Sequence, residues 1–168
     1  MPSSKKILVA VDNFDNSRKA LTYVAEMVRG RDDAQVRVFH IIVPIPPELR
    51  EHGGSEDPAK EAQLSRELQA AQSRWIEAQQ QAFAPTLQAI TAYLVNHGVP
   101  PQSISSESCA CVQEANLDIC LLEAAAAWDA GTLVVGWDTF SSFEEAMKRH
   151  LAEKLIRKGQ GLTFWIVK

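Results

Sequence analysis

The sequence lacks long hydrophobic runs and a strong charge of either sign. No apolar run approaches the roughly 20 residues that cross a bilayer. The apolar stretch after Lys5 and Lys6 stops at Asp12, which is too short for the core of a signal peptide. The formal net charge of −4 provides no basic field for nucleic acid or anionic lipid. We therefore expect a cytoplasmic protein that binds neither nucleic acid nor a membrane.

Cysteine is scarce, and the three cysteines form no metal motif. There is no CxxC pair and no nearby histidine cluster to complete a zinc site. Cys109 and Cys111 alternate in "SCACV" and would share one face of a strand, whereas Cys120 falls on a predicted helix. We interpret all three as structural thiols and expect no metal.

The short motifs of common catalytic sites are also absent. The chain has no G-x-S-x-G elbow, no P-loop and no HxxH-type metal pair. Its four histidines are spread along the sequence, and only His150 is predicted to face a ligand crevice. The sequence therefore favours a role other than catalysis.

What the sequence does contain is a regular alternation of strand and helix patterns. Apolar or β-rich runs lie at 5–12, 35–43, 103–112, 132–135 and 161–168, with helical periodicity between them. The first run is apolar throughout, as in a central strand covered on both faces. Residues 1–168 are therefore predicted to form a single α/β domain, a three-layer, doubly wound, five-stranded parallel sheet.

Two helical segments can be delimited from their caps. The first begins with Asp15, Asn16 or Ser17 as its N-cap and ends at Gly30. The second follows the second strand, with Asp57 as its cap and Pro58 at the first helical position.

Pro85 interrupts this second segment, and the helical pattern beyond it is either a second helix or a kinked continuation. The part before Pro85, residues 58–83, is about 26 residues and about 40 Å long, more than packing on the sheet requires. It is either a projecting lid or partner-binding arm, or a plain packed helix.

In a fold of this class, ligands bind beyond the carboxyl ends of the strands. Three of these ends carry Asp12, Ile41 and Gly136. Asp12 would either accept hydrogen bonds from a ribose or base, or cap the following helix turn. Gly136 resembles the start of a phosphate-binding turn, because a helix is predicted to open at Ser141 or Ser142.

Four segments of the chain resemble the universal stress protein family, in the order expected for it. They are "ILVAVDNFDNSRKALTYVAEM", "VRVFHII", "GTLVVGWDT" and "HLAEKLIRK". The resemblance covers nearly the whole chain. It implies a five-stranded parallel domain of the adenine nucleotide alpha hydrolase-like type, usually dimeric. Many members bind ATP through a loop of pattern G-x-x-G-x9-G-[ST].

In this sequence the family's ligand loop is altered at three of its four positions. Gly136 keeps the first glycine, Thr139 stands at the second, and Arg149 and His150 replace the final Gly-Ser pair. A β-branched residue such as Thr139 does not adopt positive φ easily.

The start of the helix after this loop is predicted to be closed by the protein itself. Ser142 and Glu145 match a capping box, and Asp138 and Glu144 add negative charge there. We therefore predict no cofactor in the family's usual mode.

Two pairs of residues at the crevice each have two interpretations. ATP or AMP could be bound with Arg149 and His150 in place of the glycine loop, since arginine can hold phosphate bidentately. The same basic residues also suit the later turns of a helix that begins with acids. Phe14 and Trp137 either narrow the crevice for a smaller, more apolar ligand or fill the core.

The C-terminal strand, residues 162–168, predicts a homodimer. It is aromatic and β-rich, and at a sheet edge it would expose unpaired backbone groups. The resemblance also implies dimers through this strand, although Leu162 and Thr163 replace the family's usual Pro-Val. The leading hypothesis is a dimeric stress-response or regulatory module with an unidentified protein partner. The alternative is a nucleotide-binding member, with slow ATP hydrolysis as an activity open to it.

Overall fold

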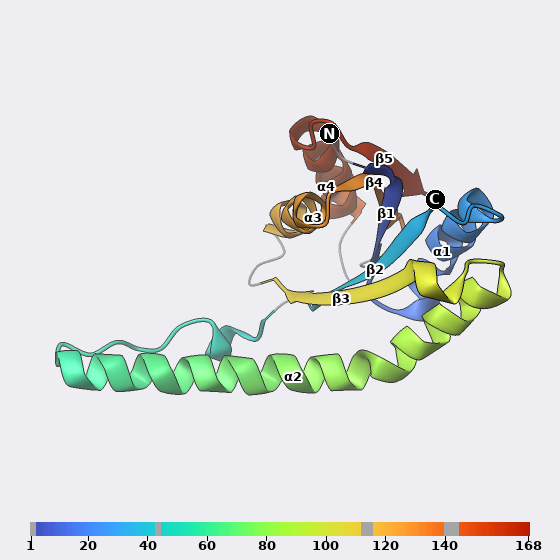
Figure 1. The fold of residues 1–168 in the computed structure, drawn as a ribbon. Helices are drawn as coiled ribbons and strands as arrows, with labels where there is room; N and C mark the ends of the chain where they lie inside the picture. The colour runs from blue at the N-terminus through green and yellow to red at the C-terminus, as the bar shows by residue number, and fades with distance from the viewer. Residues whose placement is uncertain (1–2, 43–44, 112–115, 140–144) are drawn as a thin grey trace.

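A single parallel sheet organises the chain. The computed structural model describes residues 3–42, 45–111, 116–139 and 145–168 (Figure 1). The strands are β1 (Ser3–Val11), β2 (Gln35–Ile42), β3 (Ile104–Ala110), β4 (Ala130–Gly136) and β5 (Thr163–Val167). They lie in the order β3-β2-β1-β4-β5, and every neighbouring pair is parallel. The predicted five-stranded parallel sheet is confirmed.

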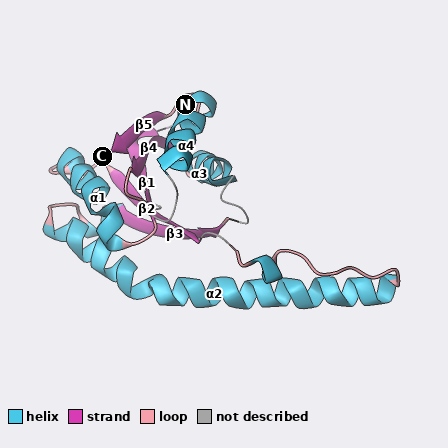
Figure 2. Ribbon diagram, turned by 180° about the vertical axis from the view of Figure 1, so that it is seen from behind, coloured by secondary structure: helices cyan, strands magenta, loops and turns pink. Residues whose placement is uncertain are grey.

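Helices cover both faces of the sheet, as the doubly wound prediction requires. The helices α1 (Phe14–Val28) and α2 (Pro58–Asn96) lie on one face, and α3 (Leu117–Ala127) and α4 (Glu145–Lys158) on the other (Figures 1 and 2). Two short 3₁₀ turns, η1 (Pro47–Leu49) and η2 (Pro101–Ser103), complete the described elements. Successive residues of β1 alternate between the two cores, with Val9 under α1 and α2 and Leu8 under α3.

The long segment between β2 and β3 is one continuous helix, which resolves the alternative left open at Pro85. Helix α2 runs through Pro85 and bends toward the sheet in its C-terminal part (Figure 1). Its only buried residues are Phe83, Ile90 and Leu94, all in that C-terminal part. Residues 58–82, which we call the helical arm, extend beyond the sheet in both ribbon views (Figures 1 and 2). Of the two alternatives for this segment, the structure shows the projecting helix and not the packed one.

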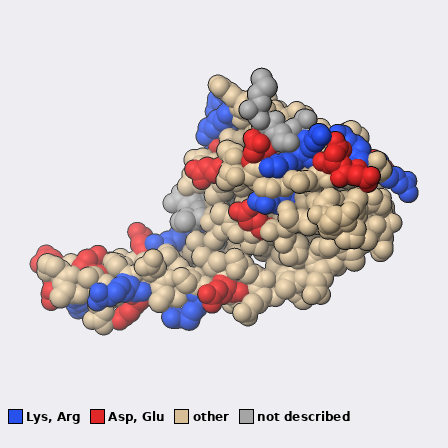
Figure 3. Space-filling view, in the orientation of Figure 1, with Lys and Arg blue, Asp and Glu red and all other residues tan. Residues whose placement is uncertain are grey.

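The segment after β2 runs back along the helical arm and is hydrogen-bonded to it. The Gln72 side chain donates to the Leu49 carbonyl, and the Ser55 N–H donates to the Glu61 carboxylate at 2.7 Å. Acidic and basic side chains are interspersed on the arm's visible face (Figure 3). In the described part of the chain, no helix is both long and apolar enough to span a membrane.

Candidate ligand crevice at the carboxyl ends of the strands

The candidate crevice lies between β1 and β4, where the order of the strands across the sheet reverses. Strands β1 and β4 are neighbours, with Ala10 opposite Val135. The helix after β1 packs on one face and the helix after β4 on the other, which makes this pair the topological switch point. Asp12 and Gly136 come from these two strand ends, so the fold brings them to the same edge of the sheet.

Asp12 is held by the first turn of α1. One carboxylate oxygen accepts from the Asn13 N–H at 2.7 Å, and the other accepts from the Asn16 side-chain amide at 3.2 Å. Of the two roles considered for Asp12, the structure shows the local capping one.

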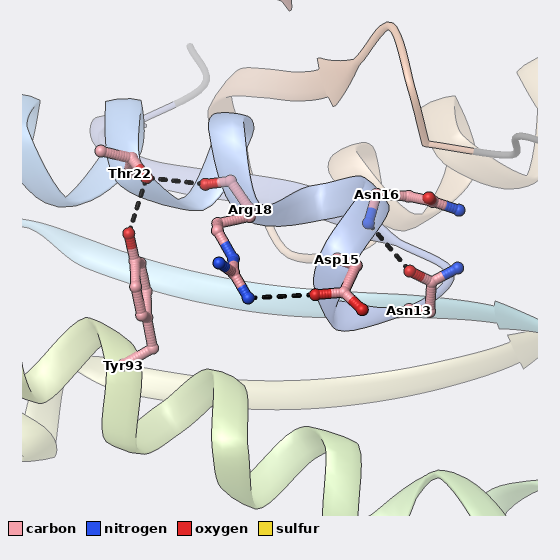
Figure 4. Close-up of polar contacts among 6 residues, drawn as sticks. All are labelled: Asn13, Asp15, Asn16, Arg18, Thr22 and Tyr93. Carbon is pink, nitrogen blue, oxygen red and sulfur yellow. Dashed lines mark hydrogen bonds and ion pairs between the residues drawn. The ribbon is translucent and has the colours of Figure 1, made fainter.

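The N-cap of α1 is Asn13, so the prediction of Asp15, Asn16 or Ser17 was wrong by up to one helical turn. Asn13 has an extended backbone, φ −149° and ψ 173°, and its side chain accepts from the Asn16 N–H at 2.9 Å (Figure 4). Asp15 instead pairs with Arg18 at 3.0 Å. Several Asx residues in a row make such a start ambiguous from sequence, because each of them can cap.

The turn after β4 is closed by its own side chains. The Thr139 N–H donates to the Gly136 carbonyl at 3.1 Å, and the Thr139 side chain is only 2% exposed. A Cβ on Gly136 would lie 2.6 Å from the Thr139 hydroxyl oxygen and 3.4 Å from the Ala20 Cβ. Gly136 is therefore required by close packing against Thr139 and α1. The Thr139 hydroxyl has no hydrogen-bond partner among the described residues, and neither has the buried Ser17 hydroxyl.

Two further contacts tie this turn to its surroundings. The Lys19 ammonium of α1 lies 3.1 Å from the Asp138 carboxylate. The Trp137 N–H donates to the Val167 carbonyl at 2.6 Å, and the Lys168 ammonium lies 5.4 Å from the centre of the Trp137 ring. Sequence reasoning missed Lys19, since nothing local to α1 indicates that it reaches the turn after β4.

Phe14 packs against α2. Its ring lies edge-on to Tyr93 at 5.3 Å between centroids, and the Tyr93 hydroxyl shares a 2.7 Å hydrogen bond with Thr22 (Figure 4). This contact joins the start of α1 to the C-terminal part of α2 and favours the core-filling interpretation of Phe14.

Ile41 and His40 face opposite sides of β2. Ile41 is 3% exposed and packs in the core under α3 and α4. His40 stacks flat on Phe83 of α2, with 3.5 Å between ring centroids and 6° between the planes. Burial lowers the pKa of His40 to about 4, and the Asp12 carboxylate opposes that shift. His40 was not among the predicted site residues, although the alternation in "VRVFHII" places it on the same face as Val36 and Val38.

Arg149 and His150 lie on the exposed surface of α4, beyond its first turn. Neither side chain forms a hydrogen bond or ion pair with another residue in the described part of the chain. Leu151, the next residue, points inward and is 9% exposed. The predicted capping box of Ser142 and Glu145 depends on Ser142, which lies outside the described residues. The predicted helix start at Ser141 or Ser142 lies outside them as well.

The three cysteines come together where β3 ends and α3 begins. Cys120 lies close enough to Cys109 and Cys111 for both to influence the pKa of its thiol, and none of the three forms a disulfide. Burial raises the pKa of Cys120 to about 12 and also raises the pKa of Cys109. Thiols of this kind are poor nucleophiles at neutral pH. Within the described ranges, no group of three or more His, Cys, Asp or Glu residues is arranged to hold a metal ion.

A model of the universal stress protein family matches residues 3–160. The chain belongs to the universal stress protein family. None of the curated proteins matches it. Solved universal stress proteins share its fold at low sequence identity.

Three solved structures illustrate this likeness. MJ0577 is 14% identical with a TM-score of 0.64, covering 98% of this chain and 96% of its own. A universal stress protein in complex with cAMP is 14% identical with a TM-score of 0.59 and the same coverage. The Archaeoglobus fulgidus universal stress protein in complex with dAMP is 19% identical with a TM-score of 0.51, and both chains are covered completely. At these identities the likeness concerns the fold.

The four positions of the universal stress protein loop pattern lie in different surroundings in this chain. Gly136, at the first glycine of the pattern, ends β4, and Thr139, at the second, is buried against it. Arg149 and His150, at the final pair, are exposed on α4. The four positions therefore differ in burial as well as in residue type.

Proposed function

We propose that this universal stress protein is a dimeric regulatory module that does not hold ATP in the family's usual manner. One observation carries the proposal: the Thr139 side chain fills the turn after β4, with its hydroxyl oxygen in the space beside Gly136. A glycine loop binds phosphate because its backbone can approach the oxygens closely. The buried Thr139 side chain takes up that room, so we expect no cofactor in the usual mode.

The polar groups around this turn support the same proposal. Both Asp12 carboxylate oxygens accept hydrogen bonds from the first turn of α1. The Lys19 ammonium, which reaches this turn from α1, is paired with Asp138. A nucleotide would have to displace these contacts, and the loss of each would reduce its net binding energy.

A second candidate function is binding of an adenine nucleotide, with slow hydrolysis of ATP. Two solved relatives were crystallised with dAMP and cAMP. Arg149 and His150 are exposed and have no partner within the described residues, which leaves both side chains able to contact an anion.

Isothermal titration with ATP and with AMP distinguishes the two candidates. The purified protein is first checked for nucleotide carried through purification. No retained nucleotide and no saturable binding is the expected result. Saturable binding at one site per chain would contradict it, and its loss in Arg149→Ala but not in Arg157→Ala would support the second candidate. Arg157 is a suitable control because it is also exposed on α4.

A further variant asks whether the loop alone prevents binding. The combination Thr139→Gly, Arg149→Gly and His150→Ser restores the family's loop pattern. We expect it to gain measurable ATP affinity. If it gains none, the closure by Asp12 and Lys19 is also part of the block.

We also propose that β5 forms the dimer interface. It is an edge strand of the sheet, and an exposed edge is a template for pairing with another chain. An apolar patch continues from this edge onto α1. Trp165 lies edge-on to Tyr23 at 5.3 Å between centroids, and Tyr23 and Met27 are 39% and 44% exposed. The helical arm, which buries no side chain of its own, is the surface we assign to a protein partner.

Sedimentation of charge variants tests the interface. Met27→Glu should shift the protein from dimer to monomer, because it places a carboxylate in the patch. Ile119→Glu is the matched control, since Ile119 is 43% exposed but lies on α3, on the opposite face of the sheet. An unchanged dimer with Met27→Glu, or dissociation by both variants alike, would contradict a β5 interface.

A further inference from the structure

A cavity lies at the end of the sheet opposite the crevice. Its volume is about 510 Å³, within the range of small-molecule sites. It opens between the C-terminal ends of α3 and α4, where β4 begins. Apolar side chains from α3 and from the residue before β5 form its walls, among them Leu122, Ala125 and Leu162. Two charged residues, Asp129 and Lys158, also line it.

Asp129 has an unusual backbone. It directly follows the C-cap of α3 with φ 56°, and it is the one non-glycine residue in the described part of the chain with positive φ. Its N–H donates to the Ala126 carbonyl at 3.0 Å, as in a helix that ends with a left-handed residue. Glycine occupies such a position at lower cost, because it has no Cβ.

The charge of Asp129 is also unfavourable at this place. The C-terminal end of a helix carries partial negative charge, which disfavours a carboxylate, and the Lys6 ammonium, which donates to the Trp128 carbonyl at 3.1 Å, offsets part of that charge. Asp129 is exposed and has no side-chain hydrogen bond or ion pair with any residue that the structure describes. A carboxylate without a partner at the carbonyl end of a helix breaks a local rule, and such positions are candidates for a function.

Lys158 does not neutralise Asp129, because its ammonium is directed at another carboxylate. The Lys158 ammonium lies 2.7 Å from Asp118, and the Lys154 ammonium lies 3.8 Å from the same side chain. The Asp118 side chain is 2% exposed, and these lysines help to lower its pKa against the effect of burial. Lys158 is thus paired across the α3–α4 contact, whereas the Asp129 side chain, which also lines the cavity, has no ion pair with a described residue.

We propose that this cavity binds a small organic cation, a protonated amine with an apolar body. The ammonium would lie against the Asp129 carboxylate. The apolar body would pack on the walls formed by Leu122, Ala125 and Leu162. The site shares no residue with the crevice beyond Gly136, so a test of this proposal does not test the function proposed above.

Titration with n-butylammonium, followed by amide NMR of the full chain, tests the site. We expect saturable shifts at Asp129, Ala130 and Gly159. Butyrate, which has a similar body and the opposite charge, should cause none. Preferential binding of butyrate would overturn the proposal, because Lys158 would then be the recognising group. Absence of saturable shifts with n-butylammonium would overturn it as well.

Three variants separate the charge from the fold. Asp129→Asn keeps a side chain that tolerates positive φ, and it should weaken n-butylammonium binding at least about tenfold, the loss expected for one charged contact. Glu77→Gln, on the helical arm, removes the same charge elsewhere and should leave binding unchanged. Equal affinity of Asp129→Asn and the parent chain would overturn the proposal.

Asp129→Gly tests whether the residue is held at a cost to stability. It should abolish binding and raise the melting temperature, because glycine relieves both the backbone strain and the helix-end repulsion. A lowered melting temperature would show that Asp129 is there for the fold, and this too would overturn the proposal.

Discussion

The buried imidazole of His40 makes a quantitative prediction about stability and pH. His40 is 8% exposed and stacks on Phe83 of α2. Burial lowers its pKa from about 6.5 to about 4. Between these two values the unfolded chain binds a proton that the folded protein does not. The folded state is therefore fully stabilised above about pH 6.5 and loses stability as the pH falls toward about 4.

The size of this effect follows from the same two pKa values. Complete titration corresponds to about 3 kcal/mol, and lowering the pH from about 7 to about 4.5 should remove about 2 kcal/mol of the free energy of unfolding. The other groups with shifted pKa values affect stability in other pH ranges. Asp33 and Asp118 have lowered pKa values and lose their contribution only below about pH 4, whereas Cys109 and Cys120 have raised values and act above about pH 9.

Urea unfolding followed by tryptophan fluorescence measures the effect directly. His40→Phe keeps an aromatic ring against Phe83 and cannot be protonated, so most of the pH dependence in this window should disappear. His150→Gln removes an exposed imidazole from α4. It should leave the pH dependence of stability unchanged, because His40 is still present. If the parent chain and His40→Phe lose the same stability between about pH 7 and about pH 4.5, His40 is not buried as a neutral ring.

Three further changes test the packing around the crevice and the α3–α4 contact. Thr139→Val should raise the free energy of unfolding by about 1 kcal/mol in urea titrations, because it replaces a buried hydroxyl that has no partner among the described residues. A decrease would mean that the hydroxyl is hydrogen-bonded. Lys158→Met should lower it by about 1–2 kcal/mol, because the buried Asp118 carboxylate keeps only Lys154 at 3.8 Å, and adding Asp118→Asn should recover part of the loss. Phe83→Ala should lower the free energy of unfolding by about 3 kcal/mol and move the pKa of His40 back toward its ordinary value, which imidazole NMR titration would measure. An unchanged pKa of His40 would refute the role of the stack.

The fold class could be predicted from the sequence because its signals are local. The apolar run ending at Asp12 predicts a strand covered on both faces, and Asp57 with Pro58 predicts a helix start that the structure confirms. The alternation of strand and helix patterns then leaves few topologies, since parallel crossovers are right-handed. The family resemblance is confirmed, because a model of the family matches residues 3–160.

The candidate site depended far more on tertiary structure. Residue identity alone shows that Thr139 is not glycine, but only the fold shows that its side chain is buried beside Gly136 and that Gly136 packs on Ala20 of α1. The pairing of Lys19 with Asp138 and the stack of His40 on Phe83 join residues far apart in the chain. No periodicity within one segment can indicate such pairs.

The sequence by itself determined which faces of the strands and helices are apolar, because burial imposes the periods of 2 and 3.6 on each segment separately. Only the tertiary structure decided which of those faces meet. It decided that α2 continues through Pro85 and bends in its C-terminal part, and that the three cysteines converge. It also left Asp129 at the mouth of a cavity between two helix ends. These outcomes depend on contacts between distant segments, whose energies exceed local preferences of about 1 kcal/mol per residue.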